Sequence, residues 1–255
     1  MNALEIESLT VRYGRTVVVR DVSISVPKGR TVGLVGESGS GKSTVAGAAV
    51  GLVKPLDGSI RVDGVSALGA GRDARRARRR LQLVFQDPFS ALDPKMTVGD
   101  SIAEAFRATG RSWSRDERVE RVRDLLRQVH LDPERAGDRP GSLSGGQRQR
   151  VTIARALAGE PSVLIADEVT SALDVSVQGA ILNLLREVQE RLELSMLFIS
   201  HNLAVVRYIS DEVFVMRGGE LVESGETESL LERPADPYTQ DLLDAVPVLG
   251  QRMVF

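Results

Sequence analysis

Residues 31–43 read Thr-Val-Gly-Leu-Val-Gly-Glu-Ser-Gly-Ser-Gly-Lys-Ser, and this stretch decides the fold. The apolar run 31–35 is typical of a buried strand, and residues 43–53, rich in small side chains, are expected to form a helix. Between them, residues 36–43 match the phosphate-binding pattern G-x-x-x-x-G-K-[ST]. Its glycines let successive backbone N–H groups face one anion, and the start of the helix adds the positive end of its dipole. An incidental glycine-rich turn is the alternative, which the flanking strand and helix disfavour.

This loop predicts a site for a nucleoside triphosphate. Lys42 has the length to reach the β- and γ-phosphates, and the Ser43 hydroxyl is a suitable ligand for Mg²⁺. The candidate nucleotide contacts of the loop are Gly36, Ser38, Gly39, Ser40, Gly41, Lys42, Ser43 and Thr44.

A second group of residues also predicts a nucleotide site. Residues 162–168 read Ser-Val-Leu-Ile-Ala-Asp-Glu, an apolar strand that ends in two carboxylates. Asp167 suits the coordination shell of Mg²⁺, and Glu168 suits a base that polarises the attacking water. Two acidic residues that merely begin a loop are the alternative, which the buried strand and the separate phosphate-binding loop disfavour.

The hydrophobic pattern predicts an α/β fold with a mainly parallel sheet, because short apolar strands alternate with helices. Residues 1–30 alternate like antiparallel strands, and residues 214–224 resemble a closing hairpin around Arg217-Gly218-Gly219. After Gln86 the chain becomes helical, which indicates an insertion between two halves of the core. The further strands are expected at 60–62, 81–85, 163–166 and 196–200, and the further helices at 98–109, 115–129, 147–157 and 175–192.

Composition excludes several classes of protein. The chain has 255 residues, 33 Lys and Arg against 35 Asp and Glu, and no cysteine, so it has no disulfide, thiolate zinc site or Cys-ligated cluster. The longest apolar run, 45–53, is far shorter than the roughly 18 residues of a membrane span. We expect a soluble chain of the cell interior, held at a membrane only by other chains.

Further motifs carry a resemblance to a known family. Leu143-Ser144-Gly145-Gly146-Gln147 resembles the signature motif of ATP-binding cassette (ABC) ATPases, and 163–168 resembles their Walker B strand. The other motifs of that family follow in the right order over residues 4–235. They are the adenine-stacking aromatic at Tyr13, the Q-loop glutamine at Gln86, the D-loop at 171–174 and the switch histidine at His201.

The resemblance implies a P-loop NTPase (RecA-like) core with an antiparallel β subdomain and an inserted α-helical subdomain. It places a discontinuous ATP-binding core at 1–86 and 151–235, a helical signature subdomain at 87–150 and a short tail at 236–255. ATP and Mg²⁺ are the implied cofactors. The implied catalytic residues are Lys42, Gln86, Glu168 and His201. The implied nucleotide contacts outside the loop are Tyr13, Val18, Ser144, Gly146, Gln147 and Asp174, and the implied Mg²⁺ ligands are Ser43, Gln86 and Asp167.

Two of these residues also have a purely structural explanation. Taken alone, Tyr13 is an exposed strand aromatic, whereas in the motif set it offers adenine a face worth about 1–3 kcal/mol of stacking. Taken alone, His201 is a polar residue at a strand end, whereas its motif position favours a hydrogen bond toward the γ-phosphate. The signature loop opens a second helix toward an anion, so the resemblance implies that it serves the ATP of a partner subunit.

Branch-level similarities point to the peptide/nickel importers. They are 84–89 (VFQDPF) with 92–94, residues 171–178 (SALDVSVQ) and Asp236-Pro237-Tyr238-Thr239. Val169 departs from the family, since a Pro commonly follows the catalytic Glu. Because the sequence stops shortly after Pro-Tyr-Thr and has no Cys, we expect a short-tailed member without the C-terminal extension and cysteine cluster of some relatives, or half of a protein that is fused elsewhere. Nickel and metal chelates therefore stand beside peptides as expected cargo, and the sequence does not name which.

We therefore expect the ATP-hydrolysing subunit of an ABC importer at the cytoplasmic face of the plasma (inner) membrane. The expected partners are two transmembrane permease subunits, a second ATP-binding subunit (a related chain or a copy of this one) and, indirectly, an extracytoplasmic substrate-binding protein, with no nucleic acid. A soluble ABC ATPase of DNA repair, translation or cluster assembly is the alternative. The six arginines of 72–80 are expected as a solvated helix face, with a membrane partner or lipid headgroups as the alternative.

Overall fold

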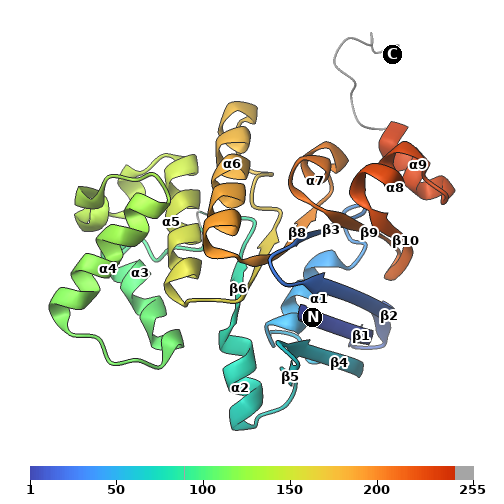
Figure 1. Cartoon of the computed structure of the whole chain (residues 1–255), viewed down its shortest axis with the longest axis horizontal. Helices are drawn as coiled ribbons and strands as arrows, with labels where there is room; N and C mark the ends of the chain where they lie inside the picture. Colours follow the sequence, from blue (N-terminus) through green and yellow to red (C-terminus); the bar gives the residue numbers. More distant parts are fainter. Residues whose placement is uncertain (89, 245–255) are drawn as a thin grey trace.

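The computed structural model describes residues 1–88 and 90–244 and arranges them around two β-sheets (Figure 1). The larger sheet has six strands in the order β10-β9-β3-β8-β7-β6. All of its neighbouring pairs are parallel except β10 with β9. The strands are β3 (Thr31–Val35), β6 (Leu81–Val84), β7 (Val163–Asp167), β8 (Ser195–Ser200), β9 (Glu212–Arg217) and β10 (Glu220–Glu226). The predicted α/β class, mainly parallel sheet and closing hairpin are confirmed.

A smaller antiparallel sheet has the order β2-β1-β4-β5. Its inner face carries Leu4 and Ile6, then Leu9 and Val11, so the alternation of buried side chains skips one position. Ser8 has φ +49°, and the register shifts between Ile6 and Leu9, which identifies a β-bulge that returns the apolar side chains to one face. The strands are β1 (Asn2–Tyr13), β2 (Thr16–Pro27), β4 (Asp57–Val62) and β5 (Val65–Ser66).

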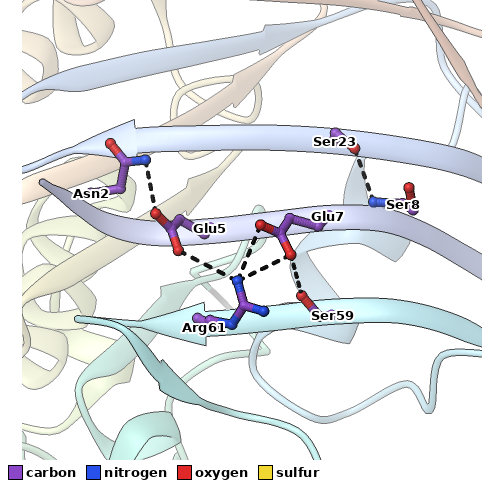
Figure 2. A network of polar contacts seen from close by, with 7 residues as sticks. All are labelled: Asn2, Glu5, Glu7, Ser8, Ser23, Ser59 and Arg61. Carbon is purple, nitrogen blue, oxygen red and sulfur yellow. Dashed lines mark hydrogen bonds and ion pairs between the residues drawn. The ribbon is translucent and has the colours of Figure 1, made fainter.

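The outer face of this sheet carries a polar network (Figure 2). One guanidinium nitrogen of Arg61 on β4 lies 3.1 Å from both carboxylate oxygens of Glu7 and 3.9 Å from Glu5 on β1. Ser59 donates to Glu7 at 2.9 Å, and Asn2 donates to Glu5 at 3.0 Å. Exposed ion pairs of this kind contribute about 0–1 kcal/mol each, so the sheet depends mainly on its apolar face.

The central sheet is buried on both faces, and successive side chains alternate between two apolar cores. Val163, Ile165 and Leu197 face the antiparallel sheet and α1 (Lys42–Ala49). Leu164 and Phe198 face the core formed with helices such as α5 (Gly145–Ala158), α6 (Val175–Leu192) and α7 (Leu203–Ile209). Alternation with both faces covered explains why these strands read as continuous apolar runs in the sequence.

The helices of the predicted insertion lie together on one side of the sheet (Figure 1). They are α3 (Val98–Glu104), the 3₁₀ helix η1 (Ala105–Thr109), α4 (Arg115–Gln128), the 3₁₀ helices η2 (Pro133–Gly137) and η3 (Pro140–Ser142), and α5. The helix predicted over 98–109 thus tightens to 3₁₀ geometry after Glu104. The helix predicted over 43–53 ends earlier, because Gly51 has φ +81° and stops it. The domain boundaries at 86/87 and 150/151 stay a prediction.

The arginine run forms α2 (Arg72–Arg79), which buries Ala74 and Ala77 and keeps five of the six arginines of 72–80 exposed. Arg78, the half-buried one, donates to the carbonyl of Gly69 at 2.9 Å, and Arg80 lies 3.1 Å from Asp63. The structure therefore agrees with a solvated helix face.

The last helices of the described part are α8 (Thr227–Glu232) and α9 (Pro237–Asp244). The predictions for Phe89 and for the tail beyond residue 244 lie outside the described residues. Within the part of the chain that the structure describes, no helix is long and apolar enough to cross a membrane.

We predict that Gly33→Ala destabilises the fold. A Cβ at Gly33 would lie 2.4 Å from Val206 Cγ1 and 2.9 Å from Ser210 Oγ, so α7 would have to move away from β3. Overpacking of this kind lowers the free energy of unfolding by about 1–3 kcal/mol, which thermal unfolding measures. Gly179→Ala is the matched control, since a Cβ there meets nothing within 4 Å and α6 gains helix propensity. Equal melting temperatures for Gly33→Ala and the wild type would contradict the prediction.

Candidate functional site

Three loops meet at the carboxyl edge of the parallel sheet. The phosphate-binding loop follows β3, the Asp167-Glu168 pair ends β7, and His201 follows β8. The three strands are neighbours in the order β3-β8-β7, with Val35 paired to Ser200 and Asp167 paired to Ile199. Because carboxyl ends of parallel strands share one edge, residues far apart in the sequence come together there.

Lys42 lies at the centre of this edge and is only 4% exposed. Its ammonium donates to the carbonyl oxygens of Gly36 at 2.8 Å and Glu37 at 2.7 Å. Burial lowers the pKa of Lys42, while the carboxylates of Glu168, Asp167 and Glu37 act in the opposite direction. The side chain is thus held inside the loop that would receive a triphosphate.

The loop offers an anion the start of a helix. Gly41 takes φ +107° as the N-cap of α1, and among the described residues no side chain caps this end or places an acidic group in its first turn. The first N–H groups of a helix have no partner within it, and the macrodipole makes this end positive. Neighbouring backbone fixes the loop: Gly219 N–H donates to the Ser40 carbonyl at 3.0 Å. The residues present therefore fit a phosphate chain.

Asp167 fits a divalent cation. It is 8% exposed, and its Oδ1 atom has no hydrogen-bond partner among the residues described. Burial raises the pKa of Asp167, and the hydroxyl of Ser43 opposes this by hydrogen bonding. Mg²⁺ is commonly held by one or two carboxylates together with substrate phosphates. A free carboxylate oxygen beside a serine hydroxyl is the expected protein part of such a site.

Glu168 lies beside His201. The Nδ1 atom of His201 is 3.3 Å from Glu168 Oε1, and the side chains are 55% and 15% exposed respectively. Glu168 also has φ +48°, so the backbone turns sharply directly after β7. Val169, the residue that follows Glu168, is buried in the helical core. The structure therefore brings together Lys42, Ser43, Asp167, Glu168 and His201.

Three other candidates lie on β2, on β1 and after β6. Val18 on β2 borders the loop, because a Cβ on Gly41 would be 2.9 Å from the Val18 carbonyl oxygen. Tyr13 is 51% exposed at the end of β1, as an aromatic platform requires. Gln86 is exposed two residues beyond Val84, which pairs with Ala166 next to Asp167.

The signature loop lies at the start of α5. Ser144 and Gln147 form a reciprocal capping box, with Gln147 N–H to Ser144 Oγ at 3.4 Å and Ser144 N–H to Gln147 Oε1 at 3.0 Å. Gly146 packs against Val177 of α6. Asp174, the exposed N-cap of α6, makes no side-chain capping bond to the helix. The loop and Asp174 therefore lie side by side at two helix starts, as a surface for a second subunit requires.

Sequence reasoning missed one residue at the phosphate-binding loop. Tyr238 of α9 accepts a hydrogen bond from the Glu37 backbone N–H at 2.9 Å, although 201 positions separate the two residues. The Pro-Tyr-Thr stretch was visible in the sequence, but only as a similarity to one branch of a family. No local pattern reveals such a long-range contact.

Comparison with known proteins gives a consistent result. The family model described as "ABC transporter" matches residues 19–171. A Brucella ovis protein, provisionally named as a peptide import ATP-binding protein, is 49% identical to this chain over 232 residues. The match covers 90% of this chain and 73% of the relative. The oligopeptide transport ATP-binding protein OppF of Bacillus subtilis is 44% identical over 253 residues, covering 96% of this chain and 82% of the relative.

A solved structure agrees with the fold. The ATP-binding cassette MJ0796, described as a dimer in a post-hydrolysis state bound to ADP and phosphate, superposes with a TM-score of 0.78 at 28% identity. The match covers 88% of this chain and 98% of that one.

We predict that Asp167→Asn stabilises the metal-free, nucleotide-free chain. A carboxyl with a raised folded pKa binds its proton more tightly in the folded state, so stability falls as the pH rises from the unfolded to the folded pKa. Removing the charge restores this stability, so at pH 8 the melting temperature of the variant lies above that of the wild type. The difference in melting temperature between the variant and the wild type becomes smaller as the pH is lowered.

Thermal unfolding in EDTA from pH 8 to pH 5 measures this effect. Asp241→Asn, which alters an exposed carboxyl of α9, is the control and should leave the melting temperature unchanged. A lower melting temperature for Asp167→Asn than for the wild type at pH 8 would refute the electrostatic argument.

Proposed function

Since this chain belongs to the ABC transporter family, we propose that it is the nucleotide-binding subunit that hydrolyses ATP to power an importer of peptides. The observation that carries the proposal is the convergence of Lys42, Asp167 and Glu168 at one sheet edge. The peptide-transport names of relatives 44–49% identical over most of the chain supply the cargo class.

In this proposal the loop and Tyr13 hold ATP. Backbone N–H groups at the start of α1 and the ammonium of Lys42 bind the phosphates, and Tyr13 with Val18 receives the adenine. Ser43, Gln86 and Asp167 hold Mg²⁺, which when bound offsets charge on the phosphate oxygens. Lys42 already lies among backbone carbonyls, so a small movement of its flexible side chain exchanges a carbonyl for a phosphate oxygen.

Glu168 is the residue proposed to activate water. It is largely buried beside Lys42 and its carboxylate faces His201, so it can accept a proton from an attacking water while His201 holds the γ-phosphate side of the site. His201 is half exposed, which leaves it free to move with the nucleotide. Gln86, two residues after β6, links the site to the helices that follow.

The proposed active form contains two ATP-binding subunits. Ser144, Gly146 and Gln147 lie at the start of α5, and Asp174 lies at the start of α6, where Gly146 packs against Val177. Val175, next to Asp174, is 84% exposed, which is unusual for a large aliphatic side chain and suits a subunit interface. A head-to-tail pair would place this surface on the partner's ATP, and either a related chain or a second copy is compatible with it.

The permease is proposed to dock beside β6 and the helical segment. A groove of about 340 Å³ lies between β6, η1 and α5, lined by side chains that include Phe85, Ala105 and Arg155. Phe85 is 49% exposed and precedes Gln86, so a helix seated here would contact the neighbour of a Mg²⁺ ligand. This contact would hold the chain at the cytoplasmic face of the membrane, with residues 87–150 as the docking subdomain and 1–86 and 151–235 as the ATP-binding core.

The proposal is tested by purifying tagged Glu168→Gln chain from gently solubilised native membranes with Mg-ATP. Two multi-span permease subunits and an ATP-binding partner are expected to copurify, and Phe85→Glu should lose the permeases while it keeps ATP binding. Recovery of soluble factors or nucleic acid instead would favour a soluble ABC ATPase and overturn the transporter proposal.

We predict that Glu168→Gln retains ATP binding and loses hydrolysis by about 10²–10⁴-fold, because an amide accepts no proton from water. Steady-state phosphate release by the assembled complex measures the loss. Glu187→Gln is the matched control: Glu187 Oε2 lies 3.0 Å from His130 Nε2, so it is also a glutamate beside a histidine, but it lies on α6. Undiminished turnover in Glu168→Gln would remove Glu168 from the mechanism.

A further inference from the structure

The last described helix returns to the phosphate-binding loop. Tyr238, in the first turn of α9, is 3% exposed, and its hydroxyl accepts the Glu37 N–H at 2.9 Å. Glu223 of β10 fixes the approach to α9 by accepting the N–H groups of Ala235 at 2.8 Å and Asp236 at 3.1 Å. The segment that carries Tyr238 is thus anchored independently of the loop.

Tyr238 and Lys42 bind the same peptide group from opposite ends. The N–H that donates to Tyr238 belongs to Glu37, and the C=O of that same peptide belongs to Gly36, which accepts the Lys42 ammonium at 2.8 Å. A peptide group is planar, so fixing its N–H also fixes the direction of its C=O. The orientation of one of the two carbonyls that hold Lys42 therefore depends on the tyrosine hydroxyl.

The end of β9 holds both partners in place. The guanidinium of Arg217 lies 4.8 Å from the centre of the Tyr238 ring, a cation–π contact that fixes the ring plane. The preceding residue, Met216, packs so closely on the loop that a Cβ on Gly36 would lie 2.0 Å from its carbonyl oxygen. The 36–37 peptide is therefore confined between β9 and the tyrosine.

We propose that Tyr238 is a positioning residue of the nucleotide site, whose hydroxyl sets the 36–37 peptide and through it the ammonium of Lys42. Tyr238 touches no phosphate; it acts on the loop that binds the phosphates. The inference rests on the proposed ATP-binding function, and it gives the Pro-Tyr-Thr stretch a physical task at the site.

The test compares Tyr238→Phe with the wild type in the full chain. Phenylalanine keeps the ring and its contact with Arg217 and removes only the hydroxyl, which accepts the Glu37 N–H and also hydrogen-bonds the Glu37 side chain. We expect the dissociation constant of a fluorescent ATP analogue with Mg²⁺, and the KM for ATP of the assembled complex, to rise about three- to tenfold. The kcat at saturating ATP should change less than about twofold, since Glu168 and His201 are unaltered. Amide hydrogen exchange of the peptide containing Glu37 should quicken.

Tyr208→Phe is the matched control. Tyr208 of α7 also combines a hydroxyl hydrogen bond with an arginine over its ring: its hydroxyl donates to Asn183 of α6, and Arg186 of α6 lies 5.0 Å from its ring centre. It should leave nucleotide affinity unchanged. Tyr238→Ala separates packing from positioning: it should lower the melting temperature as well as the affinity, whereas Tyr238→Phe should lower mainly the affinity.

The possible results separate the positioning role of Tyr238 from the proposed ATP-binding function. Wild-type affinity, KM and exchange in Tyr238→Phe would overturn the positioning role while leaving the ATP site intact. Failure of the wild-type chain itself to bind the ATP analogue would overturn the proposed function, and the positioning role with it.

Discussion

The buried ammonium of Lys42 lies 2.8 Å from the Gly36 carbonyl and 2.7 Å from the Glu37 carbonyl, with Glu168 and Asp167 close enough to affect its pKa. A charge in such a place is costly unless polar groups surround it. The carboxyl edge of the parallel sheet supplies them here, because it brings the loop after β3 together with the end of β7. The strand order, the glycine-rich loop and the paired carboxylates therefore act together to surround the Lys42 ammonium with polar groups.

This edge requires a sheet that is covered on both faces. The apolar side chains of β7 and β8 alternate between a core under the antiparallel sheet and a core under the helices, and both must pack closely to keep water out. Close approach explains why β3 carries Gly33 beneath α7 and why the loop begins with Gly36 against Met216. The outer polar network around Arg61 adds little to this, since its groups are solvated. The rigidity of the site comes from the two cores.

Much of this arrangement could be predicted from the sequence, because its signals are local. The apolar runs gave strands β3, β7 and β8 to within one residue, and 3.6-residue spacing gave α4 to within one residue, while α6 was placed at its observed bounds. Other features are not local. The bulge at Ser8 and the early end of α1 depend on backbone geometry at single residues, and the proximity of Glu168 to His201 came from a family resemblance. The Tyr238 contact joins positions 201 apart, which no periodicity reveals.

The polar groups of the site that lack a protein partner within the described chain are the groups that Mg²⁺ and phosphate would bind. Asp167 keeps a buried oxygen without a partner among the described residues, and α1 begins without a side-chain cap. Mg²⁺ would give the Asp167 oxygen a partner, and the phosphates would give partners to the N–H groups of α1. Because Mg-ATP would bind the folded chain, its binding would raise the free energy of unfolding. The start of α5 differs, because its capping box already satisfies two N–H groups and Gly146 packs against Val177 of α6. Of the two helix starts, α1 is therefore the one whose N–H groups lack side-chain partners in the part of the chain that the structure describes, so it gains more from a bound phosphate than α5 does.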